Sequence, residues 1–168
     1  ARHFDDVRRS GIIAIKLQKG DILRWVLLAE KGDHVILATK KGQAIRFKES
    51  DAREMGRVAQ GVRAIRLRKG DELVGADVVG SKEKESLLLV VTEQGFGKKT
   101  NVKHYRVQRR GGSGIKTAKV TSKTGNVVQA KVVGPEVEGL IAISKKGQGI
   151  RTSLKEISEL SRQTQGVR

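Results

Sequence analysis

Hydrophobic residues in this chain occur in short runs separated by polar turns that contain glycine. Valine, isoleucine and threonine dominate the runs, while Gly, Asp, Asn and Lys fill the gaps, a pattern typical of strands joined by tight turns. The predicted strands are residues 12–17, 22–28, 34–39, 43–47, 62–67, 72–79, 86–92, 96–100, 115–120, 126–133, 140–144 and 148–152. Short helical turns are predicted after some fourth strands, at the capping-box pattern of residues 153–156 and near Ser50 or Asp51.

These strands belong to a sequence repeat. Equivalent glycines recur at intervals of 50, 53 and 52 residues, namely Gly11, Gly61, Gly114 and Gly166. A second set recurs at intervals of 53 and 52 residues, namely Gly42, Gly95 and Gly147, and fits hairpin turns that need a positive φ. A period of roughly fifty residues with four strands predicts the blades of a propeller-like array.

We therefore predict an all-β fold of about three four-stranded blades, forming one domain over residues 1–168 with partial repeats at both ends. Residues 1–10 would end a preceding repeat, and residues 166–168 would start a further one. The three repeats between them are residues 11–60, 61–113 and 114–165. Because both ends cut through a unit, we expect a fragment of a longer array.

The charge balance points to a polyanionic partner. Lys and Arg total 35 against 18 Asp and Glu, which gives a formal net charge of +17. The sequence has no cysteine, which excludes disulfides and thiolate metal sites. The longest apolar run, residues 87–91, is far shorter than a membrane span, and the polar start lacks the features of a signal peptide. We expect a cytoplasmic protein with no membrane partner.

The repeated positions are themselves cationic. An arginine stands four residues before three of the equivalent glycines, at Arg57, Arg110 and Arg162. Another cation stands two residues after the glycine, at Arg63, Lys116 and Arg168, and Arg66 and Lys119 follow three residues later. A further cation follows the second glycine by four residues, at Arg46, Lys99 and Arg151. Since strict alternation would put cations three residues apart on opposite faces, a bulge is predicted in this first strand.

Catalytic and metal-binding chemistry finds little support in the sequence. His3, His34 and His104 lack ligand spacing as a set, and Tyr105 has no carboxylate cluster near it in sequence, so we expect a structural aromatic there. The stretch 111–117 lacks the Gly-Lys-Thr and glycine spacing of a phosphate loop, and no helices flank it as a KH domain requires. We expect no catalytic residue, metal or cofactor in this domain.

The segment Gln108-Arg109-Arg110-Gly111-Gly112-Ser113-Gly114 closely resembles the box heptapeptide of the DNA gyrase A subunit, Gln-Arg-Arg-Gly-Gly-Lys/Arg-Gly. Residues 45–50, 61–73, 95–100 and 162–167 also resemble the C-terminal domain of that family, in the same order. The resemblance covers essentially the whole chain. It implies a β-pinwheel, a propeller-like array of blades whose basic rim wraps DNA.

The resemblance also implies a functional setting. The domain would bind double-stranded DNA without catalysis and support ATP-dependent negative supercoiling, with the catalytic tyrosine, ATP and Mg on other domains of a bacterial type IIA topoisomerase. Its partners would be the gyrase B subunit, together with the rest of the A subunit, in an assembly of two of each near the nucleoid. Two departures are visible: Ser113 replaces a cation, and the box matches a later copy than the family's first-blade box, so the leading blades are missing.

The expected DNA contacts combine the repeated cations with the box: Arg46, Arg57, Arg63, Arg66, Lys99, Gln108, Arg109, Arg110, Gly111, Gly112, Ser113, Gly114, Lys116, Lys119, Arg151, Arg162 and Arg168. Glycines beside the loop arginines let backbone N–H groups approach phosphate oxygens. Three alternatives remain open: the paralogous domain of topoisomerase IV, a propeller that docks an acidic protein, and an RNA-binding β domain. The last is disfavoured because aromatic residues are only 3% of the chain, too few for base-stacking platforms.

Overall fold

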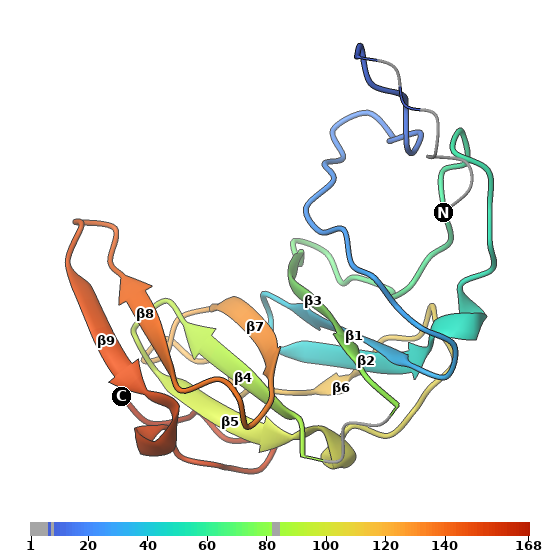
Figure 1. Ribbon diagram of the computed structural model, residues 1–168. Coiled ribbons are helices and arrows are strands. Elements are labelled where there is room, and N and C mark those ends of the chain that lie inside the picture. The colour runs from blue at the N-terminus through green and yellow to red at the C-terminus, as the bar shows by residue number, and fades with distance from the viewer. Residues whose placement is uncertain (1–6, 8, 82–84) are drawn as a thin grey trace.

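The computed structural model describes residues 7, 9–81 and 85–168, and the regular structure in this part of the chain is β apart from three 3-10 turns (Figure 1). The strands are β1 (His34–Thr39), β2 (Gln43–Lys48), β3 (Leu73–Val79), β4 (Leu87–Thr92), β5 (Gly97–Asn101), β6 (Ile115–Lys116), β7 (Val127–Val133), β8 (Gly139–Ile143) and β9 (Gly149–Ser153). The 3-10 turns are η2 (Glu49–Asp51), η3 (Val102–His104) and η4 (Leu154–Glu156). The all-β prediction is confirmed, and the short helical turns near residues 50 and 154 are 3-10 turns. His3 and most of the predicted partial repeat at residues 1–10 lie outside the described residues.

Each sheet combines strands from different repeats. The first sheet has the order β3-β1-β2-β6, so a hairpin from repeat 1 lies between a strand of repeat 2 and a strand of repeat 3. The second sheet, β5-β4-β7, repeats this arrangement one unit later, with an isolated bridge between Gly97 and Val167 in the position of β6. The third sheet is the hairpin β8-β9. The repeat period predicts which strands are equivalent, but it does not indicate which of them pair.

The first strands of the repeats differ most from the prediction. Residues 12–17, 22–28 and 62–67 carry no strand, and the predicted strand 115–120 is reduced to β6. A strand needs a neighbour to accept its backbone hydrogen bonds. Ala44 pairs with Ile115, and Gly97 with Val167, 71 and 70 residues later. The same offset from residue 62 leads to a position before residue 1, so this sequence holds no equivalent hairpin for residues 62–67.

Both faces of the first two sheets are buried. Alternate residues of β1 point to opposite sides, so that Ile36 and Ala38 join the cluster between the first two sheets while Leu37 packs with Ile45 and Phe47 on the other side. A third cluster, which includes Leu89 and Val133, fills the space between the second sheet and β8-β9. The three sheets are therefore stacked through apolar layers, as in a row of propeller blades.

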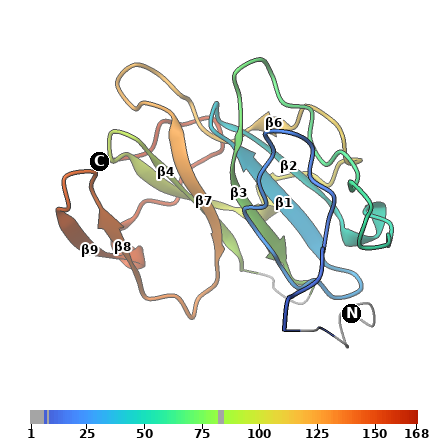
Figure 2. The same ribbon diagram turned by 90° about the horizontal axis from the view of Figure 1, so that it is seen from above.

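Strands β3 and β7 bring the first two sheets together at one edge. They run side by side in Figure 2, and a Cβ atom on Gly75 would collide with the backbone of Ala130. The carboxylate of Asp77 in β3 accepts a hydrogen bond from the Val132 N–H at 2.9 Å and lies 3.7 Å from Lys131 Nζ. We call this the inner edge. β6 and the Val167 bridge lie at the opposite end of each sheet order, which we call the outer edge.

Candidate nucleic-acid interface

The loop arginine makes the same hydrogen bond in all three repeats. Its guanidinium donates to the carbonyl oxygen two residues after the glycine that begins its own repeat. The donor–acceptor distances are 3.4 Å for Arg57 to Ile13, 3.1 Å for Arg110 to Arg63 and 3.0 Å for Arg162 to Lys116. Each of these arginines thus ties the end of a repeat to its beginning, and each remains partly exposed.

Backbone hydrogen bonds also hold each arginine-glycine loop against the beginning of its own repeat. We call residues 12–17, 62–67 and 115–120, which begin the three repeats, the first segments. The N–H of Lys16 donates to Ala59 O at 3.2 Å, that of Arg66 to Gly112 O at 2.8 Å and that of Lys119 to Thr164 O at 3.0 Å. On its other side, the loop of repeat 2 contacts the first sheet, where Gln108 N donates to Arg46 O at 2.8 Å. The loop of repeat 3 contacts the second sheet in the equivalent way, through Leu160 N and Lys99 O at 2.8 Å.

Two of the equivalent glycines are required where the first segment meets a sheet. Gly114 has φ +71°, and a Cβ atom there would lie 2.6 Å from the carbonyl oxygen of Ala44 in β2. Gly166 has φ +88°, and its Cβ would lie 2.7 Å from the Gly97 carbonyl oxygen in β5. Only glycine combines a positive φ with this close approach. The repeat glycine therefore fixes the basic segment to the outer edge.

The first-segment cations are exposed. Arg63 and Arg66 are exposed, with the buried Ile65 between them, and Lys116 and Lys119 are exposed on either side of buried Thr117 and Ala118. Both cations of a pair therefore reach solvent although they are three residues apart. The predicted irregularity is present, but it consists of the end of β6 at Lys116 and a bend at Ala118, not a bulge within a longer strand.

The fourth-strand cations of the first two sheets have partners inside the protein. The Arg46 guanidinium donates to Val102 O at 3.2 Å and to His34 Nδ1 at 3.2 Å, and burial lowers the pKa of Arg46. Burial also lowers the pKa of His34, which favours the neutral ring whose Nδ1 accepts this bond. Lys99 Nζ donates in the equivalent way to Leu154 O at 2.6 Å. Arg151, the third member of the set, is exposed on β9.

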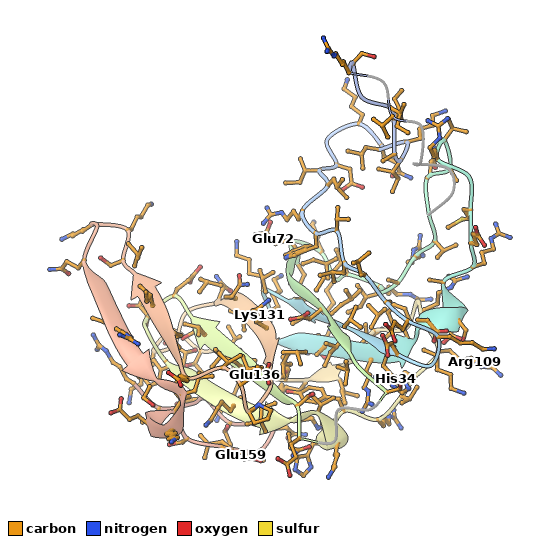
Figure 3. The ribbon with its side chains drawn as sticks, viewed as in Figure 1. His34, Glu72, Arg109, Lys131, Glu136 and Glu159 are labelled. Atoms are coloured by element: carbon orange, nitrogen blue, oxygen red, sulfur yellow. The ribbon has the colours of Figure 1, made fainter. Side chains whose placement is uncertain are left out.

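Within the box, the two arginines play different parts. Arg110 Nε donates to Asp51 O at 2.7 Å, in addition to the bond to Arg63, whereas the Arg109 side chain is exposed and points away from the sheets (Figure 3). Gly111 N donates to Ala64 O at 2.6 Å, and Gly112 and Gly114 are partly exposed. Gln108 Nε2 is buried without a hydrogen-bond partner. Ser113 is exposed at the position where the related box carries a cation.

Lys98 is a site residue that the repeat pattern does not reveal. Its side chain is buried in β5, and its Nζ donates to Ser161 O at 2.7 Å, Arg162 O at 2.7 Å and Thr164 Oγ1 at 3.1 Å. Desolvation, with a smaller contribution from the charge of Arg162, lowers the pKa of Lys98 to about 8. This ammonium group therefore shapes the loop that carries Arg162. The signal in the sequence is a cation where the equivalent residues are Ile45 and Ile150.

The segments and loops follow one another along the outer edge. The first segment of repeat 2 contacts the loop that carries the box, residues 108–114, and this loop contacts β2. β2 also pairs with β6, in the first segment of repeat 3. The residues after β6 contact the loop that carries Arg162, and that loop contacts β5. The exposed or partly exposed cations on this path are Arg63, Arg66, Arg109, Arg110, Lys116, Lys119, Arg162 and Arg168. We call this path the basic edge.

The basic edge keeps its charge. The three ion pairs found over residues 7, 9–81 and 85–168 join Arg24 and Lys40 to Glu72 and Lys131 to Asp77, and none involves a cation of the basic edge.

Tyr105 is buried and its hydroxyl lies 2.6 Å from Thr117 Oγ1, which confirms its structural role. Among the described residues, no group of three His, Asp or Glu side chains could hold a metal ion, and no helix is long and apolar enough to cross a membrane.

Stacked sheets with a cationic outer edge define a propeller-like repeat domain. The chain belongs to the DNA gyrase C-terminal domain family, whose description is "DNA gyrase C-terminal domain, beta-propeller" and whose profile matches residues 1–30, 33–80, 86–134 and 140–168. The predicted family and the β-pinwheel fold are thereby confirmed.

Curated relatives include the DNA gyrase A subunits of Ureaplasma parvum serovar 3 and Staphylococcus epidermidis, each 43% identical to this chain over 165 and 166 residues. The alignments cover 98% and 99% of this chain but only 19% and 18% of those proteins, so the chain spans about a fifth of their length.

Two solved structures are also similar. A DNA gyrase A C-terminal domain matches with a TM-score of 0.83 and 32% identity, covering 95% of this chain and 53% of that one. The C-terminal domain of DNA topoisomerase IV matches with a TM-score of 0.88 over 99% of this chain and 51% of that one. Its identity is 21%, so this second likeness concerns the fold alone.

Proposed function

We propose that this chain binds double-stranded DNA along the basic edge and bends the duplex around it. The observation that carries the proposal is that the arginine-glycine loops and first segments of successive repeats join into one path, and that its cations form no ion pair with another described residue. Duplex DNA presents a row of phosphates on each strand, and a curved row of cations neutralises them as the duplex bends.

Binding of this kind would be tolerant of sequence. The helical elements in the described part of the chain are 3-10 turns of three residues each, so nothing there could enter a major groove as a recognition helix does. Arginine and lysine side chains on loops and sheet edges suit phosphate contacts, which position a protein without reading bases. Preference among sequences would then come from the ease of bending the DNA.

The cations divide into three groups in this proposal. Arg63, Arg66, Arg109, Lys116, Lys119 and Arg168 are exposed and would contact phosphate directly. Arg57, Arg110 and Arg162 would hold the loops in place and contact DNA with their remaining N–H groups. Arg46 and Lys99 would act only through the loops that they support, because their charged groups already have carbonyl partners.

The family membership suggests the wider setting. The chain would act as a non-catalytic part of a bacterial gyrase in the cytoplasm, with ATP, Mg and the catalytic tyrosine on other domains. Its partners would be the B subunit of the enzyme and the remaining domains of its own subunit. A wrapped duplex would present a crossed segment to the enzyme's gate, so that strand passage leads to negative supercoiling.

The salt dependence of DNA binding tests the phosphate contacts. If roughly 6–10 phosphates are neutralised, the affinity for a labelled duplex should fall by about 10³–10⁵ between 50 and 200 mM salt. The double variant Arg63→Gln/Arg66→Gln should weaken binding and reduce the salt slope by about 2, one for each lost contact. Lys145→Gln/Lys146→Gln removes the same charge from the exposed turn of the β8-β9 hairpin, which is not part of the basic edge, and should change the slope less. Equal effects of the two double variants, or a slope near zero, would refute the proposal.

Plasmid topology tests the bending. Relaxed plasmid is incubated with the chain, its nicks are sealed, and the linking number is measured after the protein is removed. A shift that grows with protein concentration is expected for the wild type and should be smaller for Arg63→Gln/Arg66→Gln. Tight binding with no shift would leave DNA binding in place and exclude wrapping. Preferential binding of single-stranded RNA or of an acidic protein would favour those partners instead.

A further inference from the structure

The layer of side chains between the first two sheets is thin at the inner edge. Of the strand pairs that join these two sheets in the described residues, β3 and β7 have the most extensive backbone approach, and Figure 2 shows them side by side. A Cβ atom on Gly75 in β3 would lie 2.3 Å from the carbonyl oxygen of Ala130 in β7 and 2.9 Å from the Ala130 Cβ. Because no side chain fits between them at this point, the two sheets touch through backbone.

The same layer holds a large side chain beside the outer edge. Tyr105 is the largest fully buried side chain of the described residues, and it belongs to the cluster between the first two sheets. Its hydroxyl lies 2.6 Å from Oγ1 of Thr117, the residue that follows β6, and it also bonds with the side chain of Thr100 in β5. The ring thus reaches from the outer strand of the first sheet to the second sheet. With glycine and alanine at one end and tyrosine at the other, the layer has the shape of a wedge.

Asp77 fastens the thin end of the wedge. Its carboxylate in β3 accepts a hydrogen bond from the Val132 N–H of β7 at 2.9 Å and lies 3.7 Å from Lys131 Nζ. Asp77 and Lys131 hold the same place in their sheets, opposite Ile36 in β1 and Leu89 in β4. One inner strand therefore carries an acid where the next carries a base. The hydrogen bond gives a backbone N–H of β7 a partner in the neighbouring sheet.

Sheets stacked through a wedge form a curved array, with the thin end on the inside of the curve and the basic edge on the outside. The width of a sheet gives the size of the effect. Four strands about 4.8 Å apart place the inner and outer strands about 14 Å from each other. Gly75→Ala would require an opening of about 1 Å at the thin end, which turns one sheet against the other by about 4°. A longer side chain would turn it further.

We propose that Gly75 and Asp77 are positioning residues that set the curvature of the basic edge, and with it the bend of the bound duplex. Gly75 lets β3 and β7 touch, and Asp77 keeps them in contact. This role rests on the proposed function, because the curvature acts on DNA only if the duplex follows the basic edge. It also divides that function in two. The cations determine how strongly phosphates are held, whereas the inner edge, which touches no DNA, determines how far the duplex bends.

A series of substitutions at Gly75 tests the wedge. Because φ of Gly75 is not positive, a side chain there brings no backbone strain of its own and acts by pushing β3 and β7 apart. At protein concentrations that saturate relaxed plasmid, the linking-number shift per bound chain should fall for Gly75→Ala and fall further for Gly75→Leu. The salt slope of duplex binding should stay at the wild-type value. Arg63→Gln/Arg66→Gln should show the other pattern, a slope lower by about 2.

Gly97→Ala is the matched control for the substitution of a strand glycine. Gly97 in β5 also lacks a positive φ, but a Cβ atom there would meet only the Val90 oxygen, at 3.8 Å. The equivalent residue of β2 is already an alanine, Ala44. This variant should keep both the linking-number shift and the salt slope of the wild type.

Two variants of Asp77 test the fastening. Asp77→Ala removes the acceptor of the Val132 N–H and should reduce the linking-number shift at an unchanged salt slope. Asp77→Asn keeps a carbonyl oxygen for the same bond and should keep most of the shift. Circular dichroism checks that each variant is folded. If Gly75→Leu does not fold, Gly75→Ala and the two Asp77 variants carry the test.

Three results would overturn the proposed role of the inner edge. Folded Gly75 and Asp77 variants would give the wild-type shift, the salt slope would fall together with the shift, or Gly97→Ala would lose as much of the shift as Gly75→Ala. A wild type that binds DNA with the expected slope but produces no shift would refute bending itself, and this role with it. A wild-type shift that no inner-edge variant changes would refute this role alone and leave the proposed function in place.

Discussion

The guanidinium of Arg110 donates a hydrogen bond to the carbonyl oxygen of Arg63 at 3.1 Å, and the guanidinium of Arg162 repeats this bond to Lys116 at 3.0 Å. One arginine thus links the loop that ends a repeat to the segment that begins it. The same side chain is partly exposed at the basic edge. The loop arginines therefore combine a structural bond with a position suited to DNA, and the two uses can be separated by experiment.

Arg110 and Arg109 form a matched pair for this separation. Arg110→Gln removes the bonds to Asp51 and Arg63 and should lower the free energy of unfolding by about 1.5–3 kcal/mol, the usual range for a hydrogen bond from a charged group. It should also weaken DNA binding. Arg109→Gln should weaken DNA binding while the unfolding free energy changes by less than about 0.5 kcal/mol, because the side chain is exposed. Urea unfolding and duplex binding measure both. Equal stability losses would show that the bonds of Arg110 to Asp51 and Arg63 add nothing.

Gly114 and Gly147 separate close approach from backbone conformation. Both have a positive φ, +71° and +81°, but only Gly114 faces a backbone atom, the Ala44 oxygen at 2.6 Å from a Cβ position. Gly147→Ala should cost about 1–2 kcal/mol for the left-handed conformation alone. Gly114→Ala should cost clearly more, because β6 must also move away from β2. Thermal or urea unfolding checks this, and a smaller loss for Gly114→Ala would contradict the packing argument.

Lys98 should make stability depend on pH in the alkaline range. Its pKa is about 8 in the folded chain and 10.5 ordinarily, so between these values the unfolded chain binds more protons and stability rises with pH. The unfolding free energy of the wild type, relative to Lys98→Met, should therefore increase from pH 8 to pH 10.5. Lys119→Met, at an exposed position, is the control and should follow the wild type. A constant difference between wild type and Lys98→Met would rule out this titration.

Asp33 should give a pH dependence of the same sign, with stability rising as the pH rises, but in the acid range. Its carboxylate accepts from Glu30 N at 2.8 Å and from Ser81 N at 2.9 Å, and these bonds, that of Glu30 first, lower the pKa of Asp33. The stabilisation is therefore present above the ordinary pKa of 3.8 and is lost as the pH falls through the lowered value. Asp33→Asn should be less stable than the wild type at pH 7, with a gap that closes in acid. Asp21→Asn, in an exposed turn, should show no such gap.

Much of the fold follows from local sequence signals. Positive φ values at Gly42, Gly95 and Gly147 match the predicted hairpin turns, and the strands from residue 34 onward, apart from residues 62–67 and 115–120, lie within two residues of their predicted limits. The pairing of strands from different repeats does not follow from such signals. Equivalent strands such as β3 and β7 have the same pattern of apolar and polar residues, so the pattern does not indicate which hairpin each one pairs with. Pairing depends on which segments the stacked layers bring together: Thr39 pairs with Leu73, 34 residues later, and Ala44 with Ile115, 71 residues later.

The candidate site was predictable in part for a similar reason. The register of the repeat correctly marks Arg63, Arg66, Lys116 and Lys119 as exposed cations. It also predicts Arg46 and Lys99 as DNA contacts. In the structure these two cations donate to carbonyl groups of η3 and η4, more than fifty residues later in the chain, which the repeat cannot indicate. Lys98 escapes the pattern because it occupies a position that holds isoleucine in the other repeats. The contacts of all these cations with DNA remain predictions.

Because each of the first two sheets contains strands of different repeats, the order of synthesis determines when a sheet can be completed. The hairpin β1-β2 is complete at Lys48, but its outer neighbour β6 ends only at Lys116. At a translation rate of about 5–20 residues per second, this hairpin waits roughly 3–14 s for its last strand. Neither of the first two sheets can be completed as soon as its own repeat has left the ribosome. Each is completed with a delay, by a segment that is translated two repeats later.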